Sequence, residues 1–364
     1  MKLLDICEAI VDCPHSTAKD EGNGYPLIRT PNVGKGRLKL AGVHRVSENV
    51  YNLRNERAVP QVDDLILARE APVGNVAIIR QGQRVCLGQR TVLIRPNKKC
   101  VDPDFLVYYL LSPELQHKLL SSANGATVSH LNMSSIRSLE VQVPDIEVQK
   151  RIGAILARID DKIELNNAIN ENLEQQAQAI YRSMFVTLHH DSDRMGLLSE
   201  LITVKYGKDH KKLNDGVYPV YGSGGIMRYV ERPLYDKESV LIPRKGSLNN
   251  VMYVNEPFWS VDTMFYTEMK QPNVAKFVFH FVKSKDLASL NAGSAVPSMT
   301  TDILNSMELR IPSADRLAEF EGLVAPLYRA IEDNTRQSAR LAALRDTLLP
   351  KLMNGEIDVS EVKV

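Results

Sequence analysis

The chain has 364 residues, with 45 Lys and Arg against 44 Asp and Glu and a formal net charge of +1. This length can hold two or three domains with separate cores, and the ordinary composition excludes a disordered or low-complexity chain. No apolar run approaches the roughly 20 residues of a membrane span, and the start lacks the basic-then-apolar order of a signal peptide, so we expect a cytoplasmic protein with no membrane contact.

Residues 1–144 alternate apolar and polar side chains between Gly and Pro turns, which predicts a mostly β domain with a helix or two. Within it, Leu65–Ile79 predicts a strand, a loop and a strand, and residues 102–120 predict a helix. Basic and amide residues cluster in the predicted loops, and such side chains can pair with base edges and phosphates. The candidate DNA contacts in this domain are Arg29, Lys35, Arg37, Arg69, Asn75 and Arg90. For any single one, a solvated surface residue is the alternative.

The four cysteines all lie in the first third of the chain, at Cys7, Cys13, Cys86 and Cys100. Cys7 and Cys13 with His15 come nearest to a metal-ligand set. Their spacing matches no common zinc pattern and a fourth ligand is not evident, so we expect buried free thiols and no metal site.

Residues 145–190 predict one long helix, because apolar residues recur at helical spacing with no Gly or Pro after Gly153. Residues 191–312 then read as a second mostly β domain, in which Val240–Val254 predicts a strand, a loop and a strand. Its candidate DNA contacts are Lys208, Lys211, Lys212, Ser223, Arg244, Lys245, Asn249 and Asn250.

The Gly-rich run Tyr221–Tyr229, which contains Ser223, has two interpretations. Glycines in such a run commonly supply turns with positive φ between strands. Alternatively, small residues let the backbone approach a DNA sugar-phosphate chain, with Ser223 and Arg228 as donors.

An internal repeat relates the two halves. Gly125–Pro144 aligns without a gap on Gly293–Pro312, at an offset of 168 residues. Looser matches pair Arg69 with Arg244 and Asn75 with Asn250.

The same offset continues into residues 313–364, which predict a second long helix. Both helices carry an Asn at one core position of a heptad, Asn166 and Asn334, where a polar residue typically fixes register. We expect an α+β protein whose two helices pair as a coiled coil. The alternative is that each helix lies on its own domain. Pro326 should bend or restart the second helix.

Catalytic signatures are absent from the sequence. It contains no GxxxxGK[ST], GxSxG or HExxH pattern, and no Gly-rich turn follows a first strand of a cofactor-binding βαβ unit. The GKG triplet at Gly34–Gly36 is too short to cradle a phosphate. We therefore expect a protein without an active site. The globular segments hold the slight excess of Lys and Arg and the helical segments are mildly acidic, which suits a DNA reader held by helices.

Over almost its whole length the chain resembles the specificity subunits of type I restriction-modification enzymes. Val143–Phe185 is similar to that family's first conserved helical region, and Leu344–Ser360 to the close of the second. Tyr218–Val230, Ile242–Val254 and Pro257–Tyr266 are similar to its recurrent target-recognition segments in the second domain. Arg29–Leu38 and Gly88–Pro96 take that part in the first.

The resemblance implies a non-catalytic subunit of a phage-defence system. Its two target-recognition domains would each read one half of a split site in double-stranded DNA, held apart by paired antiparallel helices. Two methyltransferase subunits and two restriction subunits, which are ATP-driven translocases, would bind around it. S-adenosylmethionine and ATP would belong to those partners, with no cofactor in this chain. Because the loops of the two domains differ, the target should be asymmetric. A coiled-coil adaptor that binds proteins instead of DNA is the competing hypothesis.

Overall fold

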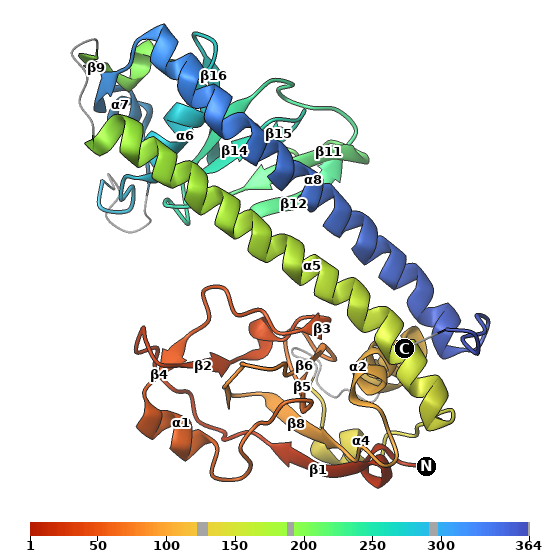
Figure 1. Ribbon diagram of the computed structural model, residues 1–364. Coiled ribbons are helices and arrows are strands. Elements are labelled where there is room, and N and C mark those ends of the chain that lie inside the picture. Colours follow the sequence, from red (N-terminus) through yellow and green to blue (C-terminus); the bar gives the residue numbers. More distant parts are fainter. Residues whose placement is uncertain (122–129, 188–192, 291–297, 363–364) are drawn as a thin grey trace. The chain divides into compact units, whose positions relative to one another are not determined.

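The computed structural model describes residues 1–121, 130–187, 193–290 and 298–362. The chain forms two compact units (Figure 1). Unit 1 combines Met1–Asn167 with Asn334–Val364, and unit 2 is Ala168–Asp333. Each unit therefore contains one globular domain together with part of both long helices.

The main sheet of unit 1 has five strands in the order β1-β8-β5-β6-β3. Its strands are β1 (Cys7–Asp12), β3 (Gly36–Arg37), β5 (Leu65–Ala68), β6 (Val76–Ile78) and β8 (Thr91–Pro96). Neighbouring strands are antiparallel except β3 and β6, which are parallel. β5 and β6 confirm the strand, loop and strand predicted over Leu65–Ile79.

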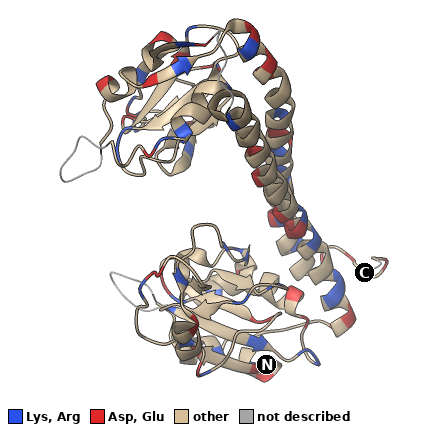
Figure 2. Cartoon of the chain, turned by 60° about the vertical axis from the view of Figure 1, so that its left-hand side comes forward, with Lys and Arg blue, Asp and Glu red and all other residues tan. Residues whose placement is uncertain are grey.

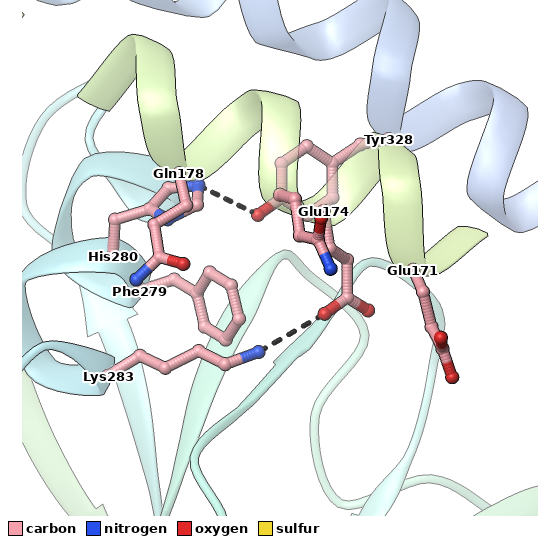
Figure 3. A pocket seen from close by; sticks show the side chains of 8 residues that line it. Glu171, Glu174, Gln178, Phe279, His280, Lys283 and Tyr328 are labelled. Atoms are coloured by element: carbon pink, nitrogen blue, oxygen red, sulfur yellow. Dashed lines mark hydrogen bonds and ion pairs between the residues drawn. The ribbon is translucent and has the colours of Figure 1, made fainter. Parts of the chain in front are cut away.

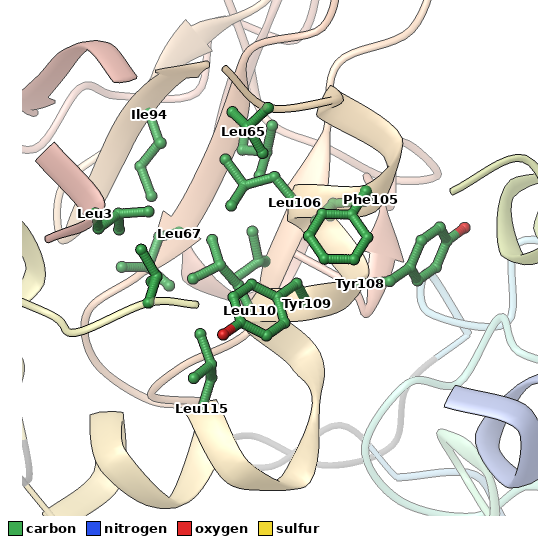
Figure 4. Close-up of a cluster of buried hydrophobic side chains, with 14 of the residues drawn as sticks. Leu3, Leu65, Leu67, Ile94, Phe105, Leu106, Tyr108, Tyr109, Leu110 and Leu115 are labelled. Atoms are coloured by element: carbon green, nitrogen blue, oxygen red, sulfur yellow. The ribbon is translucent and has the colours of Figure 1, made fainter. Parts of the chain in front are cut away.

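Both faces of this sheet are buried, which explains why β5 is apolar at every position. Successive side chains of a strand point to opposite faces. Leu65 and Leu67 join the core that Figure 4 shows, beside Phe105, whereas Ile66 and Ala68 join a separate core on the other face.

Smaller elements complete unit 1. A three-stranded sheet has the order β4-β2-β7, with β2 (Tyr25–Ile28), β4 (Arg45–Val46) and β7 (Cys86–Leu87). The helices are α1 (Glu48–Arg54), α2 (Pro103–Leu111), α3 (Pro113–Ser121), α4 (Met133–Arg137), and the 3-10 helices η1 (Leu3–Ile6) and η2 (Thr30–Asn32).

The single helix predicted over residues 102–120 was wrong in one respect, because it is two helices. Asp102 caps the first by accepting a hydrogen bond from the Phe105 amide. Ser112 is extended, with ψ of 148°. Pro113 is the cause, since a proline disfavours the helical conformation of the residue before it.

Unit 2 repeats the sheet with four strands in the order β10-β16-β13-β14. These are β10 (Ile202–Tyr206), β13 (Ser239–Pro243), β14 (Met252–Val254) and β16 (Met264–Met269). β13 and β14 confirm the strands predicted within Val240–Val254. β13 is again buried throughout, with Val240 and Ile242 in one core and Leu241 in another.

Backbone hydrogen bonds confirm that Arg69 and Arg244 are equivalent. The Arg69 amide donates to the Arg90 carbonyl at 2.9 Å, and the Arg244 amide donates to the Thr263 carbonyl at 2.9 Å. The carbonyls of both arginines accept from residues 168 apart, Leu131 and Met299.

The aligned repeat is also visible in the helices. α4 and α7 (Thr301–Asn305) coincide at the offset of 168 residues. Gly125 and Gly293, with which the alignment begins, lie outside the described residues.

The rest of unit 2 contains two further sheets. One has the order β12-β11-β15, and the other pairs β9 with β17. The bounds are β9 (Arg194–Leu197), β11 (Asp215–Gly222), β12 (Gly225–Val230), β15 (Trp259–Ser260), β17 (Glu308–Ile311), the helix α6 (Ala275–Lys283) and the 3-10 helix η4 (Leu198–Glu200).

The two predicted long helices are present, and each contributes residues to both units. They are α5 (Ile146–Tyr181), which continues into the π-helical segment η3 (Arg182–Thr187), and α8 (Ala314–Met353). Among the described residues, no helix combines the length and the apolar character of a membrane span.

The helices pair in antiparallel fashion within each unit. In unit 1, Asp160 contacts Arg345 while Asn166 contacts Asn334, so numbers rise along α5 as they fall along α8. In unit 2, Asn170 donates to the Ile331 carbonyl. The coiled-coil prediction is confirmed.

The alternative, in which each helix packs on its own domain, is partly correct. Each domain core includes the start of the helix that follows the domain and the end of the other long helix. The start of α5 packs in the unit 1 core through Ile152 and Leu156, beside Leu349 and Leu352 from the end of α8. The unit 2 core takes up the end of α5 and the start of α8 in the same way. Each domain thus rests on one helix that follows it and on the far end of the other.

The expected restart at Pro326 was wrong, because α8 is one 40-residue helix. Pro326 and Gly322, whose carbonyl would otherwise accept from residue 326, are both exposed. Water can therefore satisfy the carbonyl that a proline leaves without its donor.

Candidate nucleic-acid interface

Three predicted cations of unit 2 meet at one end of its sheet. Lys208 follows β10, and Arg244 and Lys245 follow β13. The Lys208 amide donates to the Ser260 carbonyl at 2.8 Å, and the Arg244 and Lys245 amides both donate to the Thr263 carbonyl, at 2.9 and 3.2 Å. The loop before β16 therefore gathers them. The side chains of Lys208 and Lys245 are exposed and form no ion pair within the described part of the chain.

Arg244 keeps its positive charge unneutralised. Its guanidinium carbon lies 5.4 Å from the centre of the Tyr206 ring, a cation–π distance. Its Nη1 donates to the Asp262 carbonyl at 3.0 Å. Both partners are uncharged groups, so the guanidinium stays available to an anion.

The Gly-rich hairpin joins the same group of loops. Asn250 Nδ2 donates to the Ser223 carbonyl at 2.8 Å. A Cβ at Gly246, which has φ of +84°, would come within 2.8 Å of Ser223 Oγ. The loop after β13 therefore approaches the turn between β11 and β12, and Ser223, Asn250 and Lys245 are brought together.

Three other residues of the unit 2 set serve differently. Asn249 Nδ2 donates to Asp286 Oδ1 at 3.0 Å and its Oδ1 accepts from the Ala288 amide, so its amide organises a neighbouring loop. Lys211 and Lys212 are exposed in a turn that Asp209 caps by accepting from the Lys211 amide at 3.0 Å. That hydrogen bond lowers the pKa of Asp209.

In unit 1 the equivalent arginine is neutralised. Arg69 Nη1 is paired with Asp12 Oδ1 at 2.8 Å, and Arg69 Nε donates to the Leu131 carbonyl at 2.7 Å. Arg90 Nε is paired with Glu70 Oε2 at 2.8 Å. Both predicted cations are therefore held by carboxylates.

Asn75 has the same structural part as Asn250. Its Nδ2 donates to the Val33 carbonyl at 3.0 Å and so secures the loop that carries Lys35. Lys35 is exposed, and it lines a cavity of about 260 Å³ together with Tyr108, Arg345 and other residues of unit 1. Arg29 is half-buried beside this loop, where its backbone amide donates to Asn32 Oδ1.

Arg37 is the predicted contact that the structure removes from the surface. Its side chain is 9% exposed and is paired with Asp161 at 2.6 Å and with Glu164 at 3.4 Å. It also donates to Tyr108 Oη and to the Ala157 carbonyl. Burial by itself would lower the pKa of Arg37, but the hydrogen bond to Asp161 and the negative charges of Asp160 and Asp161 outweigh it, so the pKa is raised. A guanidinium so enclosed positions the loop and does not face a ligand.

Asp12 and Tyr206 were not predicted as site residues, yet they determine whether the neighbouring arginine, Arg69 or Arg244, is neutralised by a carboxylate. Both end the first strand of their sheets, β1 and β10. The only signal in the sequence is that position, since Tyr206 directly precedes the Gly-Lys pair of the predicted basic loop.

A cavity of about 240 Å³ in unit 2 is lined by His280 and by other side chains of α5, α6 and α8 (Figure 3). His280 Nε2 is hydrogen-bonded to Tyr328 Oη at 3.0 Å, and Lys283 is paired with Glu174. Burial lowers the pKa of His280 to about 4. The ring is therefore neutral near pH 7 and serves as packing between α6 and the helices.

The cysteines are free, but one differs from the expected state. Cys13 and Cys86 are buried and Cys7 is half-buried, whereas Cys100 is exposed. The prediction of buried thiols was therefore wrong for Cys100, which lies in the turn between β8 and α2. No group of three or more metal-ligating side chains occurs among the residues that the structure describes.

Along α5 and α8, acidic and basic side chains are interspersed (Figure 2). The loops at one end of each sheet gather the candidate contacts. Two copies of a mainly β domain, each with polar loops and each followed by a long helix, define the class of duplicated two-domain proteins.

The family model of the type I restriction modification DNA specificity domain matches residues 1–175 and 196–316, so the chain belongs to this family. In an alignment 452 positions long, the chain is 24% identical to the type I restriction enzyme HindI specificity subunit of Haemophilus influenzae. The alignment covers 92% of this chain and 95% of that protein. The chain is 22% identical over 394 residues to the MjaIX specificity subunit of Methanocaldococcus jannaschii, with 96% and 88% covered.

A solved structure has the same fold. The crystal structure of the S subunit of a type I restriction-modification system from M. genitalium superposes with a TM-score of 0.59 and 17% identity, covering 97% of this chain and 95% of that one. Because the family model matches both halves, the chain is a type I specificity subunit with two specificity domains. Membership of this class confirms the prediction of a non-catalytic chain, since catalysis in such systems lies in other subunits.

Proposed function

We propose that each mostly β domain, placed at residues 1–144 and 191–312, reads one half of a split, asymmetric target in double-stranded DNA. The observation that carries this proposal is a common sheet with different loops. Equivalent backbone positions carry Asp12, Glu70 and Arg90 in one domain and Tyr206, Lys245 and Thr263 in the other. Different side chains at equivalent places present different donors and acceptors to base edges, so the half-sites should differ.

The residues proposed to contact DNA fall into two groups. In unit 2 they are Lys208, Lys211, Lys212, Ser223, Arg244 and Lys245. In unit 1 they are Arg29 and Lys35, with Arg69 and Arg90 as contacts that stay paired with Asp12 and Glu70. Four residues are proposed to position these loops, because their side chains are bonded within their own unit: Arg37, Asn75, Asn249 and Asn250.

The paired helices, predicted as segments 145–190 and 313–364, are proposed to set the number of unread base pairs and to bind two methyltransferase subunits and two restriction subunits. S-adenosylmethionine and ATP would be bound by those subunits, in the cytoplasm. Asn166 supports a register function, because it is fully buried and its Nδ2 donates to Gln337 Oε1 at 2.9 Å and to Ser338 Oγ at 3.2 Å.

The test is methylome sequencing of a host that expresses this chain with its methyltransferase subunit. A bipartite, asymmetric methylated motif is expected, and a continuous or palindromic motif would contradict the proposal. Removing seven residues from α5 and the seven at the 168-residue offset in α8 should shorten the spacer by about three base pairs, since two turns rise about 10 Å. An unchanged spacer would exclude the ruler function.

A further inference from the structure

Four positions at the end of each sheet can be matched one to one. Asp12 lies opposite Val92 in the β1–β8 ladder, and Tyr206 lies opposite Phe265 in the β10–β16 ladder. The next residue of each strand donates its amide to the first residue of the facing strand, Thr91 or Met264. Asp12 and Tyr206 are therefore equivalent.

The other three positions follow from the arginine hydrogen bonds already described. Arg69 and Arg244 are equivalent, as are the carbonyls that their amides contact and the residues that follow them. We define quartet 1 as Asp12, Arg69, Glu70 and Arg90, and quartet 2 as Tyr206, Arg244, Lys245 and Thr263.

The charges of quartet 1 are neutralised within the quartet. Its two cations are paired with its two carboxylates at 2.8 Å, Arg69 with Asp12 and Arg90 with Glu70. The formal charge of the four residues sums to zero. A phosphate that approached these arginines would compete with carboxylates already in place, and would meet their repulsion.

Quartet 2 is open. Tyr206 replaces the carboxylate beside the arginine with an aromatic face, and Lys245 replaces the second acid with a cation. Thr263 carries no charge. Two positive charges therefore remain, and neither is paired with an acidic side chain in the described part of unit 2.

We propose that quartet 2 is an electrostatic anchor on DNA and binds backbone phosphate, whereas quartet 1 contributes no net attraction. The inference rests on the proposed DNA-binding function and adds a division of labour to it. A cation that neutralises a phosphate releases counterions, which makes affinity fall with salt, with a slope of about −0.9 per contact. A cation already neutralised by a carboxylate adds little to that slope.

The experiment uses the full chain in complex with its methyltransferase subunits and a fluorescent duplex that contains the methylated motif. Kd is measured by anisotropy between about 50 and 200 mM salt. Lys245→Ala should reduce the slope of log Kd against log salt by about 0.9, and Arg244→Ala with Lys245→Ala by about 1.8. Lys237→Ala is the matched control, because Lys237 is an exposed lysine at the opposite end of β13, and it should leave the slope unchanged.

In unit 1 the expected effects are reversed. Arg90→Ala, at a half-exposed pair, should change the slope by less than half of the Lys245→Ala effect. Glu70→Gln releases Arg90 and should increase the slope by about 0.9, and Glu70→Lys, which copies the residue of quartet 2, should increase it further. The pair of Glu70 and Arg90 is partly exposed and lies outside the buried core, so the Glu70 variants test the proposal even if a variant of Arg69 or Asp12 fails to fold.

Each outcome has one meaning. Equal losses of slope for Arg90→Ala and Lys245→Ala, or a slope unchanged by Glu70→Gln, would overturn the division of labour while leaving DNA reading intact. A wild-type complex that binds the motif no better than an unrelated duplex would instead contradict the proposed function itself.

Discussion

The buried pair between Asp160 and Arg345 offers a quantitative test of how the unit 1 domain is joined to the helices. The Asp160 side chain is 4% exposed. It accepts from Arg345 Nη1 at 2.6 Å and from Tyr108 Oη at 2.7 Å. Arg345→Ala would leave this carboxylate buried with the tyrosine hydroxyl as its remaining short contact.

The expected cost follows from that geometry. Removing one partner of a buried ion pair costs about 3–5 kcal/mol, mainly because the other charge stays in a poorly solvated place. We expect about 3 kcal/mol, at the lower end of that range, because Tyr108 still donates and Arg345 is itself 15% exposed. Replacing both residues by Leu should recover most of the loss, since neither Asp160 nor Arg345 then leaves the other as an unpaired buried charge.

Urea denaturation can locate the effect, because the chain has one tryptophan, Trp259, and it lies in unit 2. Far-UV circular dichroism reports both units. With a urea slope of about 2 kcal/mol per molar, Arg345→Ala should lower the circular dichroism midpoint of unit 1 by about 1.5 M. The Trp259 fluorescence midpoint should stay in place.

Two results would refute the reasoning. A loss below about 1 kcal/mol in Arg345→Ala would mean that Asp160 is adequately solvated without its partner. A double Leu variant as unstable as the single Ala variant would mean that packing volume, and not the orphaned charge, determines the cost.

Three further predictions concern other parts of the molecule. Because burial holds the pKa of His280 at about 4, the unfolded state takes up that proton first as pH falls from 6.5. The free energy of unfolding of unit 2, measured by urea titration with Trp259 fluorescence, should therefore fall by up to about 3 kcal/mol between pH 6.5 and 4. His280→Gln should flatten this pH dependence, and an unchanged pH dependence in the variant would contradict the prediction. Cys100 should react rapidly with a thiol reagent while Cys7, whose pKa burial raises to about 12, does not, and a fast phase that survives Cys100→Ser would show another reactive thiol. Asn166→Leu should raise the melting temperature, because it removes a buried amide oxygen that lacks a partner in the described residues, a gain in stability of about 1 kcal/mol. It should also widen the range of spacer lengths found in methylated sites. A lower melting temperature would argue against this prediction.

The sequence by itself determined the features that depend on neighbouring residues. Helical periodicity without breakers predicted α5 and α8, and the matched stretches that end at Pro144 and Pro312 predicted equivalent domains. The residues of the loops were identified too, because turn residues mark where strands end. The helix break at Pro113 was missed, although the proline that causes it is local.

Tertiary structure decided which of the predicted cations are available. Arg37 meets Asp161 across 124 positions of sequence, and Arg69 meets Asp12 across 57. No local pattern specifies such pairs, because they form only when sheet and helices pack. The same packing places an aromatic ring beside Arg244. The sequence thus identifies the charged residues. Folding determines whether each charge is neutralised by an ion pair within the protein or left unpaired at its surface, since Coulombic pairing depends on distance in space.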